Sequence, residues 1–117
     1  MLWACIMIAI SSIPHLTVPG HIRHLDKLAH FIEFAVFGYL LARTMAFQRM
    51  RLGGSRILLI LLAGVLLAVF DESLQSLVPG RSRNASDWGA DIAGIIAALF
   101  LWHAIAWMRG LRQARGG

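Results

Sequence analysis

Residues Ile57 to Val78, ILLILLAGVLLAVFDESLQSLV, decide the fold of this chain. An uncharged apolar run fills the first two thirds of the stretch, and Asp71, Glu72 and Gln75 follow near its end. A helix needs about 20 predominantly apolar residues to cross ~30 Å of hydrocarbon. The stretch therefore predicts a membrane-spanning helix whose ionisable groups lie near one of its ends.

Apolar segments on both sides of this stretch predict further helices. Residues 27–47 and 87–108 are each long enough to span a bilayer, whereas the apolar stretch 2–13 covers only about 18 Å at the helical rise. The breaks between segments carry Pro14, Pro19–Gly20, Gly53–Gly54 and Pro79–Gly80. We predict an all-α, polytopic membrane protein: a four-transmembrane-helix bundle with helices at about 2–14, 27–47, 57–78 and 87–108, forming a single domain over residues 1–117.

The overall composition agrees with a membrane protein and argues against other classes. The chain has 117 residues, of which 58% are hydrophobic and 15% charged, with a mean hydropathy of +0.68. The net charge of +5 does not indicate nucleic-acid binding, because the arginines lie at the ends of apolar segments and no basic run is interleaved with aromatic residues. The single cysteine excludes an internal disulfide and a cysteine-built zinc site.

Lysine and arginine counts predict the orientation in the membrane. One side of the predicted bundle carries Arg43, Arg49, Arg51, Arg56, Arg109, Arg112 and Arg115, and the other carries Arg23, Lys27, Arg81 and Arg83. The side richer in Lys and Arg is generally cytoplasmic. We therefore expect both termini in the cytoplasm and both polar loops outside.

The acidic residues all fall in the outer half of this predicted topology. They are Asp26, Glu33, Asp71, Glu72, Asp87 and Asp91. An ionised carboxylate facing lipid at that depth costs several kcal/mol, so these groups should face one another, a water-filled cavity or a partner. Helical spacing predicts three polar stripes: Lys27–His30–Phe34, Asp71–Glu72–Gln75, and Asp87–Asp91–Gly94–Ala98. Together they predict a polar pocket that opens outward between three helices.

The residues alone leave three interpretations of this pocket open. Arg81 and Arg83 near helix N-termini suit a phosphate or carboxylate, because guanidinium groups and the helix dipole both favour anions. Alternatively, His30 and the carboxylates could hold a divalent cation or move protons. The third interpretation is a structural network in which the arginines pair with the acids to hold the loop.

Several of these residues, in order, resemble the VanZ-like family of bacterial membrane proteins. The resemblance rests on Asp26-Lys27-Leu28-Ala29-His30-Phe31, Asp71-Glu72-Ser73-Leu74-Gln75, Pro79-Gly80-Arg81, Asp87 and Gly94, and extends from Asp26 to about Leu99. The family is named for a protein of glycopeptide-resistance clusters that is associated with reduced teicoplanin susceptibility. The resemblance implies a multi-pass protein of the bacterial cytoplasmic membrane with a role in envelope biology. It implies neither an enzymatic reaction nor that this chain confers resistance.

The family's polar signature falls on Lys27, His30, Asp71, Glu72, Gln75, Arg81 and Asp87. Asp91 departs from it, since many members are expected to have asparagine there, and Glu33 is also less typical. A carboxylate at position 91 adds negative charge to the site. Adding Asp91 to the signature residues gives the candidate ligand-binding set.

We therefore expect the outward pocket to bind an anionic envelope component, such as a lipid headgroup or a lipid-linked cell-wall precursor. Arg81 and Lys27 would hold the anion, and no metal, cofactor or nucleic acid is expected to bind. One rival is an enzyme acting on a lipid headgroup or lipid-linked sugar, with His30 and Glu72 as base and acid. The other is a small multidrug-type transporter, although such carriers usually place their working carboxylate nearer the middle of the membrane. Besides membrane lipids, a second copy of the chain is a plausible partner.

Overall fold

A computed structural model describes residues 2, 3, 6, 23–46, 52–77 and 85–115. These residues form three long helices: α2 (Arg23–Met45), α3 (Gly54–Gln75) and α4 (Ala85–Arg115). Leu2, Trp3 and Ile6 are also helical, but the rest of the predicted first helix (2–14) lies outside the described residues. The all-helical class is therefore confirmed, whereas the fourth helix stays a prediction.

All three helices are long and apolar enough to cross a membrane. The qualifying segments are Lys27–Met45, Gly54–Gln75 and Ala85–Leu111, and α3 is the most apolar, with a mean hydropathy of 2.3. The outer faces of the bundle carry large apolar side chains, including Leu58, Leu62, Leu66 and Phe100. Such a surface is stable against hydrocarbon and not against water. The chain is a multi-pass membrane protein.

The observed helix ends differ by a few residues from the ranges that the sequence predicts. Helix α3 already begins at Gly54, because the extended residue Gly53 serves as its N-cap and its carbonyl accepts bonds from the N–H groups of Arg56 and Ile57. The same helix ends at Gln75, and Ser76 and Leu77 form a turn. Helix α4 continues to Arg115, since its arginine-rich end consists mainly of good helix formers.

Small residues set how closely the helices pack. Helices α2 and α4 cross at Gly94, where an added Cβ would overlap the backbone oxygen of Phe31, and one helix turn further on Ala98 lies against Gly38. Helix α3 meets α4 at Gly64, whose position leaves no room for a Cβ beside Ile95. Close contacts of this kind are how helices associate in lipid, where the hydrophobic effect between them is absent.

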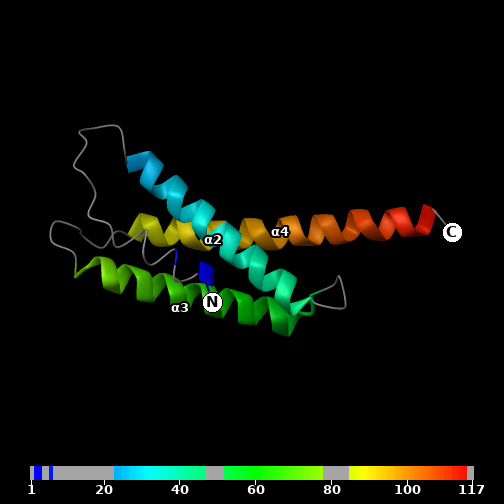
Figure 1. Cartoon of the computed structure of the whole chain (residues 1–117), viewed down its shortest axis with the longest axis horizontal. Coiled ribbons are helices and arrows are strands. Elements are labelled where there is room, and N and C mark those ends of the chain that lie inside the picture. Colours follow the sequence, from blue (N-terminus) through cyan, green and yellow to red (C-terminus); the bar gives the residue numbers. More distant parts are fainter. Residues whose placement is uncertain (1, 4–5, 7–22, 47–51, 78–84, 116–117) are drawn as a thin grey trace.

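The buried core lies between the three helices. Phe34, Ile60 and Ile95 are fully buried at its centre, one from each helix. Toward the end of the bundle where α2 finishes, the rings of Tyr39 and Trp102 meet edge to face at 5.8 Å. Figure 1 shows α2 crossing α4 and the C-terminal part of α4 projecting well beyond the other two helices.

Candidate functional site

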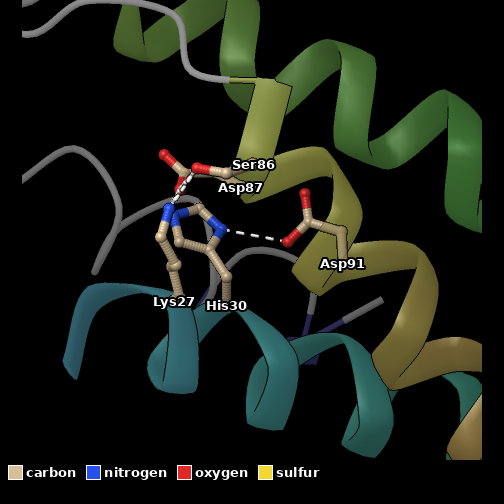
Figure 2. Close-up of polar contacts among 5 residues, drawn as sticks. All are labelled: Lys27, His30, Ser86, Asp87 and Asp91. Atoms are coloured by element: carbon tan, nitrogen blue, oxygen red, sulfur yellow. Dashed lines mark hydrogen bonds and ion pairs between the residues drawn. The ribbon is translucent and has the colours of Figure 1, made fainter. Parts of the chain in front are cut away.

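Polar side chains of α2 and α4 meet near the residue at which α4 begins. Lys27 and His30 are three residues apart on α2, so they lie on one face of that helix. Ser86, Asp87 and Asp91 come from the first two turns of α4. Figure 2 shows the side chains of the two helices pointing toward one another. They form two bridges, one above the other along α2.

The first bridge is the more exposed one and centres on Lys27. Its ammonium group donates to the hydroxyl of Ser86 and lies 3.4 Å from Oδ1 of Asp87. The Lys27 side chain is 35% exposed, whereas that of Asp87 is 8% exposed. An ion pair with this much solvent access contributes little stability by itself. Lys27 is therefore a partly exposed cation at the edge of the cluster.

The second bridge joins two buried groups. Nδ1 of His30 lies 3.0 Å from Oδ1 of Asp91, and the two residues are only 3% and 1% exposed. Because a carboxylate accepts hydrogen bonds, Nδ1 is the donor, and in the neutral imidazole Nε2 is then the acceptor. Removing either partner would leave a buried polar group without its bond, which is costly in an apolar surrounding. This bridge orients the imidazole firmly.

The close approach of the two backbones sets the position of the second bridge. Gly94 is three residues beyond Asp91, and Phe31 follows His30 directly. The contact between Gly94 and the Phe31 carbonyl therefore lies within one helix turn of both bridging side chains. Short side chains such as Asp reach across an interface only where the helices are this close.

The acidic end of α3 carries a third group of buried polar side chains. Asp71, Glu72 and Gln75 are all buried, and the Gln75 amide donates to Oδ2 of Asp71 at 2.6 Å. These three residues share a face of α3, as their i,i+3 and i,i+4 spacing predicts. The described part of the chain thus places seven of the eight candidate residues in partly or fully buried positions. They are Lys27, His30, Asp71, Glu72, Gln75, Asp87 and Asp91.

The structure leaves part of the predicted site undescribed and adds one residue to it. Arg81, the eighth candidate, and Arg83 lie outside the described residues, so their roles stay predictions. Ser86 is not among the candidate residues, yet its hydroxyl accepts a bond from Lys27. Its place next to Asp87 in the first turn of α4 is the signal that could have identified it. Within the described ranges, no group of three or more His, Cys, Asp or Glu side chains is arranged to hold a metal ion.

Comparison with known proteins identifies the family. The family model described as VanZ/LLP1 matches residues 3–107, which is most of the chain. Neither the curated proteins nor the solved structures gave a significant match. The match includes α2, α3, α4 as far as residue 107, and both bridges between α2 and α4. This multi-pass membrane protein belongs to the VanZ/LLP1 family.

Proposed function

We propose that the polar end of the bundle binds the anionic headgroup of an envelope lipid or a lipid-linked cell-wall precursor. The observation that carries the proposal is the arrangement of Lys27: its ammonium group is partly exposed and held at the first turn of α4 by Ser86 and Asp87. The N-terminus of a long helix favours anions through its N–H groups and its dipole. Cation and helix N-terminus therefore favour the same kind of ligand at the same place.

The charges at this end of the bundle favour a further cation in the site. Asp71, Glu72, Asp87 and Asp91 are buried there. These carboxylates repel an approaching phosphate, and an additional cation weakens that repulsion. Arg81 is the residue that we assign to this role, because its guanidinium group can bind a phosphate in a bidentate manner.

Native mass spectrometry in mild detergent tests this proposal. Wild-type protein should retain a phosphate-bearing lipid, and Lys27→Ala and Arg81→Ala should each lose it. Arg43→Ala is the matched control, since it removes an exposed arginine from the opposite end of the bundle and should leave retention unchanged. Equal retention in wild type, Lys27→Ala and Arg81→Ala would refute the assignment of both cations.

The geometry of the second bridge favours one alternative, a membrane enzyme acting on a lipid headgroup. A buried carboxylate that orients an imidazole at 3.0 Å is the arrangement of a general base with its positioning partner. His30 would take up the proton, and Glu72 would serve as the acid. Turnover of a lipid substrate that is lost in His30→Gln and in Glu72→Gln would favour this alternative. Retention of an unaltered lipid by wild-type protein would favour binding.

A further inference from the structure

A second feature of the bundle lies away from the polar end and is lined almost wholly by apolar side chains. It is a groove of about 480 Å³ between α3 and α4, lined by Ile57, Leu61, Ile96, Leu99, Phe100 and His103. All six residues fall within the membrane-spanning parts of the two helices. We propose that this groove is a binding site for one acyl chain of an anionic phospholipid, which is a function separate from that of the polar end.

The packing of the two helices explains why a groove exists here. Helices α3 and α4 touch at Gly64 and Ile95, where the absence of a Cβ allows close contact. The lining residues of α3, Ile57 and Leu61, lie between this contact and the start of the helix. The helices therefore separate toward the end of the bundle at which α3 begins and α2 finishes. We call this end the basic end, because Arg43, Arg56 and Arg109 lie there.

The volume of the groove fits an acyl chain better than a helix. A dry cavity of ~150 Å³ is enough for the six carbons of benzene, so a groove three times larger accommodates roughly 15–20 carbons. A helix is about 10–12 Å in diameter, which is much wider than a single acyl chain. Phe100, which is 73% exposed, adds an apolar ring to the lining.

The charges near the groove indicate an anionic headgroup. Among the described side chains, Arg43, Arg56 and Arg109 are exposed at the basic end, whereas the buried carboxylates all lie at the other end. Arg56 precedes the lining residue Ile57, and Arg109 follows His103 by six residues, or about 9 Å of helical rise. A phospholipid whose tail lies in the groove would thus place its phosphate at the level of these arginines, where each basic residue attracts anionic lipid.

His103 is the polar residue of the groove, and the structure gives it a partner within its own helix. Its Nδ1 lies 2.8 Å from the carbonyl oxygen of Leu99, which can only accept, so Nδ1 donates. With this bond made, the imidazole needs no ionic partner in the groove. The other lining residues are apolar, so a hydrocarbon chain can lie along the wall that they form.

Photo-crosslinking in vesicles tests the proposal. The protein is reconstituted in phosphatidylcholine vesicles that contain phosphatidylglycerol with a diazirine on one acyl chain, and labelled peptides are mapped. We expect saturable labelling of the groove residues on α3 and α4, competed by unlabelled phosphatidylglycerol. Leu61→Trp should abolish it by filling the groove. Leu62→Trp, the same change at a lipid-facing neighbour, is the matched control and should keep it.

Each other outcome contradicts part of the proposal. Labelling that is not saturable, or that survives Leu61→Trp, would show that the groove holds only bulk lipid. Equal labelling by a phosphatidylcholine probe would contradict the preference for an anionic headgroup. We expect Arg109→Gln to lower the preference for phosphatidylglycerol over phosphatidylcholine about fivefold. A dimer that is present in wild type and lost in Leu61→Trp would assign the groove to a second copy of the chain. Lys27→Ala should not affect this labelling, which separates this site from the polar end.

Discussion

Replacing Gly94 by alanine should push α2 and α4 apart at the place where their backbones are closest. The new Cβ would overlap the carbonyl oxygen of Phe31 and lie only 2.9 Å from the backbone nitrogen of Ala35. Both neighbours belong to the backbone of α2, so no side chain can rotate away. Restoring ordinary contact requires the helices to separate by about 1 Å, and overpacking of this kind typically costs about 1–3 kcal/mol.

The separation should also break the buried bridge. The His30–Asp91 distance of 3.0 Å would increase to about 4 Å, beyond the range of a hydrogen bond. Polar contacts between membrane helices contribute about 0.6 kcal/mol on average and up to about 1.7 kcal/mol. The total expected loss is therefore about 2–5 kcal/mol in the free energy of unfolding.

Equilibrium unfolding in mixed micelles of SDS and a mild detergent measures this loss. Gly89→Ala is the matched control on the same helix, because no atom lies within 4 Å of the Cβ that it adds. It should raise stability by up to about 1 kcal/mol through helix propensity alone. If Gly94→Ala unfolds within 0.5 kcal/mol of wild type, roughly the additivity error of such comparisons, the close approach does not stabilise the bundle. An unchanged imidazole NMR signal from His30 would likewise refute the predicted loss of the bridge.

Three further changes should be measurable with the same assay. Asp91→Asn keeps the shape of the side chain but removes the charge beside His30, so we expect the free energy of unfolding to fall by about 0.5–2 kcal/mol. A rise would mean that the buried carboxylate destabilises the bundle. Phe34→Ala empties the fully buried centre of the core and should cost about 3–5 kcal/mol, whereas Leu66→Ala on the lipid face should cost far less. Trp3→Phe removes an indole N–H that donates to the carbonyl oxygen of Glu33 on α2 at 3.2 Å. It should lower the free energy of unfolding by about 0.5–1.5 kcal/mol, and a larger loss would mean that packing of the indole ring contributes as well.

The membrane helices could be predicted from the sequence because their signal is local. About 20 mainly apolar residues predict a span whatever they pack against, and residues 57–70 supply an uncharged run that makes up most of one. Helical spacing also predicted that Asp71 and Gln75 share a face, and the bond between them confirms it. The end of α4 was harder to predict, because arginines after an apolar span indicate the membrane boundary and say nothing of where the helix stops.

The pairing between helices could not be predicted to the residue. Spacing grouped Lys27 with His30 and Asp87 with Asp91, but which cation meets which carboxylate depends on how α2 slides along α4. The contact of Gly94 with the Phe31 carbonyl fixes that register. The small residues Gly38, Gly94 and Ala98 are compatible with several helix crossings, so the pairing follows from the structure and not from the sequence.

Both bridges join α2 to α4, which is the last of the three helices to be synthesised. This order of synthesis has a consequence for membrane insertion. The ribosome completes α3 before α4 exists, so Lys27 and His30 must enter or approach the membrane without their carboxylate partners. Helix α2 is also the least apolar of the three, with a mean hydropathy of 1.2 against 2.3 for α3. A span of this lower hydropathy, with ionisable residues near one end, inserts less readily by itself than α3 does. Stable insertion of α2 should therefore wait for synthesis of α4, and a chain truncated before Ala85 should be an early substrate for membrane quality control.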